Sequence, residues 1–159
     1  MNNKGISLIA LAVMIIVMII IAAIAYTNSF DAHDKAMIAR EKEENMNVTN
    51  AIQNRFGEYM ASSTINPLSG IIIPNDLTTT SEMEEFIINY LHENGKLYTE
   101  RNAEFKAGIR KLLEDNKDHP EYTRILEHTH LIDLGIENLP TDSMYVVNYY
   151  GMTVVGPIY

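Results

Sequence analysis

The stretch that decides the fold is Lys4–Tyr26, with the sequence KGISLIALAVMIIVMIIIAAIAY. A single Lys and a Gly stand directly before an apolar run, and the 21 residues from Ile6 to Tyr26 contain no charged side chain. As a helix with a rise of about 1.5 Å per residue, this run would be about 32 Å long, close to the hydrocarbon thickness of a bilayer. Residues 6–26 are therefore predicted to form a transmembrane helix.

Three interpretations of the run predict three different mature proteins. In the first, the run is an uncleaved anchor behind a short cytoplasmic tail. In the second, it is a secretory signal peptide cut after Ala25, because Ala23-Ile24-Ala25 has a small-x-small pattern, although the run exceeds the about 7–15 apolar residues of a usual signal peptide. In the third, a peptidase cuts after Gly5, and the mature helix first anchors the chain and later packs in a filament core.

The residues around the third cleavage point resemble a known family. Lys4, Gly5, Ser7, Leu8 and Ile9, followed by the aliphatic run, are similar to the N-terminus of type IV pilin-like proteins and type II secretion pseudopilins, above all the Gram-positive variety with a KGISLI leader. The resemblance implies a leader peptide over residues 1–5, cleavage between Gly5 and Ile6 by a prepilin peptidase, and N-methylation of Ile6. It also implies storage in membrane lipid and assembly with other pilin-like subunits in a homo- or hetero-oligomeric filament. The residues of the expected assembly helix are Leu8, Ile9, Ala10, Leu11, Met14, Ile15 and Met18.

One position departs from the family pattern. The family usually carries Glu at the fifth residue after the cut, where it neutralises the N-terminal amine of a neighbouring subunit, and here that residue is Ala10. The departure suits a minor or tip subunit, which has no subunit above it to pair with. The expected function is a minor structural subunit of a type IV pilus or a type II secretion-like pseudopilus. The alternative is a single-pass membrane-anchored or secreted binding or adaptor protein with an acidic extracytoplasmic domain.

The charge of the chain lies almost entirely after the apolar run. All 21 acidic residues follow Phe30, and the part beyond Tyr26 carries 11 basic against 21 acidic residues, a net charge of −10. Nucleic acids and anionic lipid headgroups bind basic patches, so this balance argues against both as partners. Lys4 and the starting amine favour a cytoplasmic N-terminus. The expected location is thus the cell membrane, with the C-terminal domain extracytoplasmic or on a surface filament.

Residues 27–62 are expected to continue the N-terminal helix as its amphipathic half. After Gly5, no Gly occurs before Gly57 and no Pro before Pro67. In the second half of this segment the apolar side chains are spaced by threes and fours, which predicts one buried face. The charged residues, among them Arg40 to Glu44, predict a solvated opposite face, with a docking surface for the next subunit as the alternative. The apolar positions are Met37, Val48, Ile52, Phe56, Tyr59 and Met60.

The remaining residues, 63–159, are expected to form a small globular head. Loop signals surround a short extended segment at Ile71–Ile73. Ser81 and Glu84 have the spacing of a capping box, and Gly95 supplies a helix stop. Apolar stripes of helical period follow, and Pro120 has the position of a proline in a first helical turn. The helices predicted from these signals cover about 82–94, 99–115 and 120–128.

The C-terminal end changes to the composition of strands. Residues 144–156 are β-branched and aromatic-rich around a Tyr150-Gly151 break, which predicts a β-hairpin. The tyrosines of this hairpin and its surroundings either pack onto the N-terminal helix or form an exposed contact patch. The predicted fold class is therefore α+β and pilin-like, with a long N-terminal helix and a small helical head that ends in a hairpin.

Residues for catalysis are scarce. The chain has no cysteine and lacks a phosphate-binding glycine loop, a GxSxG motif and an HExxH motif. His128 and His130 with Asp133 are the only candidate metal cluster, and we interpret the two histidines as surface residues at a helix end. The sequence predicts neither an enzyme nor a cofactor or metal site.

Overall fold

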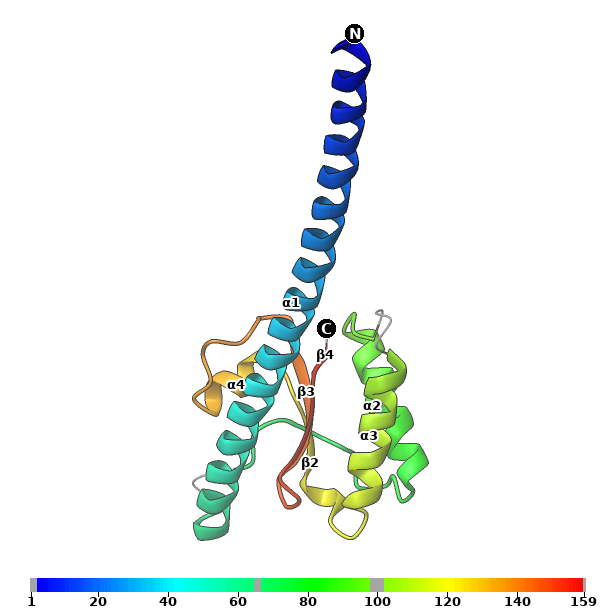
Figure 1. Cartoon of the computed structure of the whole chain (residues 1–159). Coiled ribbons are helices and arrows are strands. Elements are labelled where there is room, and N and C mark those ends of the chain that lie inside the picture. The colour runs from blue at the N-terminus through cyan, green and yellow to red at the C-terminus, as the bar shows by residue number, and fades with distance from the viewer. Residues whose placement is uncertain (1–2, 65–66, 98–101, 159) are drawn as a thin grey trace. The chain divides into compact units, whose positions relative to one another are not determined.

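The computed structural model describes residues 3–64, 67–97 and 102–158, without the side chains of residues 3–12 and 22–31 (Figure 1). The chain forms two compact units, Met1–Arg40 and Glu41–Tyr159. The second unit combines helices with a four-stranded antiparallel sheet. The predicted α+β class is therefore confirmed.

Helix α1 comprises Asn3–Ala61. The absence of Pro from this span and of Gly between Gly5 and Gly57 allows one uninterrupted helix, so the prediction of helix from Ile6 to about Ser62 is confirmed.

The buried face of α1 begins later than predicted. In the second unit its buried positions are Glu44, Val48 and Ile52, spaced by four residues and therefore on one face. Met37 is 44% exposed and Met60 is 67% exposed, so their assignment to the buried face is wrong. Glu44, expected on the solvated face, instead shares the buried side of the helix with Val48 because it lies one turn before it.

The sheet has the order β1-β2-β3-β4, with every neighbouring pair antiparallel. Its strands are β1 Ile71–Ile72, β2 Thr123–Leu126, β3 Met144–Asn148 and β4 Thr153–Ile158. The last two form the predicted hairpin, which extends two residues further than expected, and the turn contains Tyr150 and Gly151. The Gly151 N–H donates to Asn148 Oδ1 over 2.8 Å and so fixes the turn.

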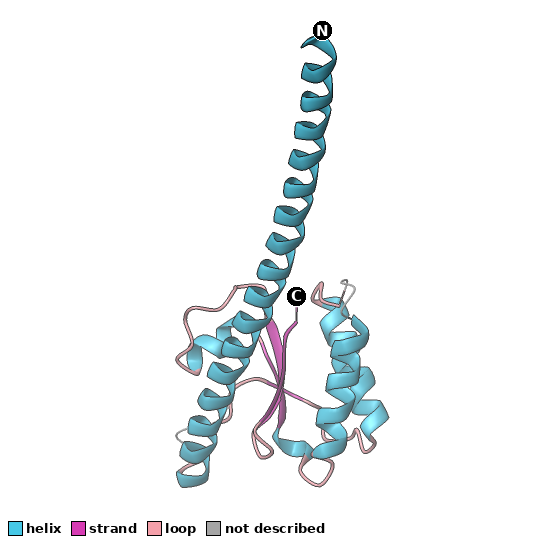
Figure 2. Cartoon of the chain, in the orientation of Figure 1, coloured by secondary structure: helices cyan, strands magenta, loops and turns pink. Residues whose placement is uncertain are grey.

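The sheet separates two hydrophobic cores. Figure 2 shows the sheet of the second unit between α2 and α3 on one side and the second half of α1 on the other. Met144 and Val146 of β3 face helices α2 and α3, whereas Tyr145 and Val147 face the other core, which contains Val48 and Ile52 of α1. Every residue of β3 is buried because both faces of the strand are covered. The second half of α1 is thus part of the packing of the head.

Helices α2 (Thr80–Glu93) and α3 (Asn102–Asp115) match two of the predicted helices, with residues 98–101 outside the described part of the chain. The capping box lies two residues earlier than predicted. The Glu82 N–H donates to Thr79 Oγ1, and the Glu82 carboxylate accepts from the Thr79 N–H, which holds the Glu82 pKa below its usual range. Glu84 instead forms a bidentate ion pair with Arg110 of α3, at 2.9 Å for each contact.

The helix predicted over 120–128 is wrong. Pro120–Tyr122 forms a single 3₁₀ turn, strand β2 follows at once, and a short helix α4 covers His128–Asp133. Strand β2 lies between β1 and β3, where consecutive residues Ile125 and Leu126 are both fully buried, one in each core. A strand covered on both faces shows no polar alternation, so an apolar pair such as Ile125 and Leu126 fits a helical stripe as well as a strand.

Candidate functional site

The first candidate site is the apolar part of α1. The nine consecutive residues Val13–Ile21 are all large, apolar and exposed, on every side of the helix. Three of them belong to the predicted assembly set: Met14 is 60% exposed, Ile15 50% and Met18 64%. In water, a helix that is apolar all round is unfavourable, because no polar face covers it. This segment therefore requires an apolar surrounding.

The other predicted residues of this site lie where side chains are not described. Gly5 and Ile6, the predicted cleavage and methylation positions, belong to the first turns of α1. The assembly residues Leu8, Ile9, Ala10 and Leu11 follow in the same helix. The predicted transmembrane segment 6–26 falls largely outside the described side chains, and its prediction stays a prediction. Among the residues that the structure does describe, no helix is both long and apolar enough to cross a membrane.

A polar clamp joins the second half of α1 to the head. Arg55 Nη2 donates to the backbone oxygen of Asp133 over 2.7 Å and lies 3.5 Å from the Asp133 carboxylate. The Ser69 hydroxyl donates to the same carboxylate. The Tyr149 hydroxyl, fully buried, donates to the backbone oxygen of Ser69 over 2.9 Å. These groups come from positions 55, 69, 133 and 149, and no local sequence motif links them.

Burial extends the pH range over which the clamp's tyrosine is protonated. Desolvation raises the pKa of Tyr149, so its hydroxyl remains a hydrogen-bond donor at neutral pH. Tyr90 behaves in the same way on the other side of the sheet. Burial and a 2.5 Å hydrogen bond to Glu127 Oε1 raise the pKa of Tyr90 to about 12. Both contacts hold the head together, and both hydroxyls are protonated at neutral pH.

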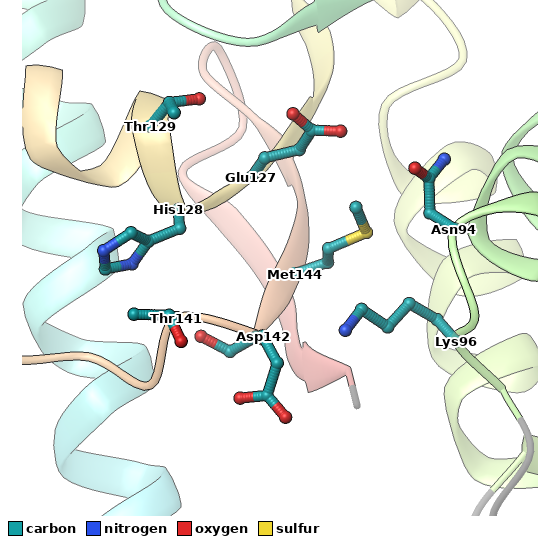
Figure 3. A pocket seen from close by; sticks show the side chains of 9 residues that line it. Asn94, Lys96, Glu127, His128, Thr129, Thr141, Asp142 and Met144 are labelled. Carbon is teal, nitrogen blue, oxygen red and sulfur yellow. The ribbon is translucent and has the colours of Figure 1, made fainter.

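The second candidate site is a pocket of about 240 Å³ (Figure 3). It lies between the end of α2, the start of α4 and the turn before β3. Within the described residues, the side chains of Lys96 and Asp142 have no ion-pair or hydrogen-bond partner. The Glu127 carboxylate accepts a hydrogen bond from the Tyr90 hydroxyl, and Asn94 Nδ2 donates to the Tyr90 backbone oxygen over 2.9 Å. The lining residues are Asn94, Lys96, Glu127, His128, Thr129, Thr141, Asp142, Ser143 and Met144.

The structure separates the roles of the histidine cluster. His130 Nδ1 accepts from the Glu127 N–H over 3.1 Å and caps the first turn of α4. His128 lines the pocket, and its Nδ1 is buried without a hydrogen-bond partner in the described chain. Asp133 is held by Arg55 and Ser69. Across the described residues, no three His, Cys, Asp or Glu side chains lie together as a metal site would need.

Comparisons with protein-family models, with curated proteins and with solved structures found no match to this chain. The function therefore has to be argued from the chain's own residues. Of the two candidate sites, the apolar segment Val13–Ile21 is the more informative. Its nine exposed apolar side chains need an apolar surrounding, whereas the residues that line the pocket range from exposed to buried and indicate no particular ligand.

Proposed function

We propose that this protein is a membrane-stored, pilin-like subunit that is cleaved after Gly5 and assembles through its apolar N-terminal helix. The observation that carries the proposal is the run of exposed apolar side chains from Val13 to Ile21, which begins eight residues after Gly5. The KGISLI sequence before it supplies the peptidase recognition that the resemblance implies. Together they favour an anchor that later changes its surroundings over an ordinary secretion signal.

The physical basis of assembly is an exchange of apolar surroundings. In the bilayer the lipid tails cover the side chains of Met14, Ile15 and Met18, and in a filament core the helices of neighbouring subunits cover them instead. Because lipid tails are as apolar as these side chains, the gain comes from close packing and not from removal of water. The unbranched methionines adapt to irregular gaps between helices.

The second half of α1 attaches the N-terminal helix to the sheet of the head. Val48 and Ile52 are fully buried against the sheet, and the Arg55 clamp adds hydrogen bonds to Asp133. The C-terminal part of the helix is thereby bound to the sheet of the head. A subunit drawn out of the membrane by its helix would carry the head with it, which a filament subunit requires.

Ala10 supports a minor position in the filament. A glutamate at this place would neutralise the amine at the N-terminus of a neighbouring subunit, and alanine has no charge to offer. A buried ammonium without a partner is costly, so a subunit with Ala10 fits best where no neighbour's amine needs it. The tip of a filament is such a place.

The proposal is tested by following the N-terminus of the full chain in cells that contain a prepilin peptidase. We expect the membrane fraction to hold a form that begins at methylated Ile6. A start at Tyr26 would identify a secreted domain, and a start at Met1 a plain anchor; either result contradicts the proposal.

A pair of leader variants sharpens the test. Gly5→Val places a β-branched side chain at the cleavage point and is expected to abolish processing. Asn3→Ala lies in the same leader, outside the KGISLI sequence, and should be processed as the wild type is. Unchanged processing of Gly5→Val would refute the proposed recognition of Gly5.

A further inference from the structure

Five ring side chains meet on the surface of the second unit and are called the aromatic cluster below: Phe56, Tyr59, His119, Tyr122 and Tyr150. Tyr122 lies edge-on to Phe56 with ring centroids 5.4 Å apart, and is stacked with Tyr150 at 5.9 Å. His119 lies 3.8 Å from Tyr150, centroid to centroid. The rings come from the end of α1, from the segment at η1 (Pro120–Tyr122) and from the β3–β4 turn.

The aromatic cluster is open to solvent, unlike the other tyrosines of the hairpin. Tyr145 and Tyr149 are fully buried, whereas Tyr150 is 50% exposed and the other four rings are partly exposed. Met60, directly after Tyr59 in α1, is 67% exposed. Aromatic and methionine side chains gathered on a surface are typical of protein interfaces, because they offer a large contact area at a low cost in conformational entropy.

Carboxylates flank the aromatic cluster. Glu58 precedes Tyr59, and Asp118 and Glu121 stand on either side of His119; all three are exposed. The Glu121 carboxylate lies 3.4 Å from His119 Nδ1.

Two of the nearby cations already have partners. Arg55 is bound to Asp133 and its Nε lies 3.8 Å from the exposed Glu58 carboxylate, and Arg124 Nη1 donates to the backbone oxygens of Glu121 and Thr123. Lys117 is the only Lys or Arg in the stretch 117–122. The second unit as a whole carries 9 basic and 19 acidic residues from Glu41 to Tyr159, so 9 − 19 gives a net charge of −10.

We propose that the aromatic cluster and its acidic flanks form a docking surface for a basic segment of a partner protein. An arginine of that segment would lie on the exposed ring of Tyr150, where the quadrupole of the ring attracts a cation and the planar guanidinium stacks. Glu58 and Glu121 would pair with further basic side chains and guide the encounter. This inference goes beyond the proposed filament role and does not depend on it.

Charge also favours a basic partner over the other two surfaces that could cover the aromatic cluster, a second copy of the chain and a phospholipid membrane. A second copy of the chain brings the same acidic unit, and two units of net charge −10 repel each other. An anionic phospholipid surface is repelled for the same reason. A basic partner is the one for which the rings and the carboxylates both act favourably.

The test uses the full chain in micelles of an uncharged detergent, with a peptide of alternating Gly and Arg as the probe. The matched peptide replaces each Arg by Gln. We expect the Arg peptide to shift the ring NMR signals of Tyr150 and Tyr122, with an affinity that falls as salt is added. Equal binding of the two peptides, or no binding of either, would overturn the proposal.

Variants locate the binding on the aromatic cluster. Tyr150→Ala is expected to weaken binding of the Arg peptide about threefold to tenfold. Ile72→Ala removes a 60% exposed apolar side chain from β1 and should leave it unchanged. The double variant Glu58→Gln, Glu121→Gln removes two exposed carboxylates and keeps every ring, and it should also weaken binding, with an unchanged urea midpoint as the check that it is folded.

Two results of these experiments would contradict the assignment. If the Tyr150→Ala variant and the double Gln variant both bind the Arg peptide with unchanged affinity, the peptide binds elsewhere on the chain. Self-association of the wild type that Tyr150→Ala abolishes, without binding of the Arg peptide, would identify a second copy as the occupant and refute a basic partner. Because neither experiment requires processing at Gly5, their outcome is independent of the proposed filament role.

Discussion

The contact between α1 and the sheet can be tested by replacing Ile52 with alanine. Ile52 is fully buried in the core that also contains Val48, Leu126, Tyr145 and Tyr149. The substitution removes three carbon atoms from that core and leaves a cavity between the helix and the sheet. We expect the free energy of unfolding of the second unit to fall.

The magnitude follows from burial. Three buried methylene-sized groups at about 0.8 kcal/mol each give about 2.4 kcal/mol, and a cavity term raises this to about 3–4 kcal/mol. The better helix propensity of alanine offsets a few tenths of a kcal/mol. Since a domain of this size has a total stability of about 5–15 kcal/mol, the loss is a large fraction of it.

Urea unfolding of the full chain in uncharged detergent, followed by the near-ultraviolet circular dichroism of the tyrosines, measures this loss. The transition midpoint is expected to fall by about 1–3 M. Met46→Ala is the matched control on the same helix, because Met46 is 58% exposed, and it should change stability by less than about 0.5 kcal/mol. A loss for Ile52→Ala no larger than that of the control would refute the packing of α1 on the sheet.

Three further predictions concern other parts of the chain. Thr79→Ala should cost about 1 kcal/mol of unfolding free energy in the urea assay and Ser81→Ala almost nothing, because Thr79 is the cap of α2; the reverse order would contradict this cap. Burial raises the pKa of Tyr149 above its ordinary value of 10.0, so its contribution to stability is complete below about pH 10 and is lost as pH rises further. Tyr149→Phe should therefore flatten the fall in melting temperature above pH 10, and an unchanged slope would exclude this role. Ala10→Glu should increase incorporation into filaments, measured by immunoblotting of sheared filament fractions against total protein, and no increase would contradict the reason given for a minor position.

The parts of the fold with local signals could be predicted from the sequence. The stripes of α2 and α3 repeat at helical spacing over more than two turns, and the hairpin has strand composition on both sides of Tyr150-Gly151. Strand β2 could not be predicted from the sequence, because it is stabilised as a strand by partners that lie about 50 residues before it, in β1, and about 20 residues after it, in β3. Four residues with both faces buried leave no periodicity to detect.

The sequence also could not predict which residues make particular contacts. Thr79/Glu82 and Ser81/Glu84 have the same capping-box spacing, and only the tertiary pairing of Glu84 with Arg110 decides between them. The candidate docking surface combines α1, η1 and the hairpin turn, and η1 follows the end of α1 by about 60 residues and precedes the turn by about 30. The abundance of tyrosine could indicate an exposed patch, but not that Tyr150 is exposed while its neighbour Tyr149 is buried.

The central claim is that the chain is processed at Gly5 and keeps the apolar helix. Tandem mass spectrometry of the N-terminal peptide, from protein extracted from membranes of cells that contain a prepilin peptidase, tests it most directly. We expect a peptide that begins at Ile6 with one methyl group on its amine and is absent from cells without the peptidase. An N-terminus at Met1 or at Tyr26 in the presence of the peptidase would contradict it.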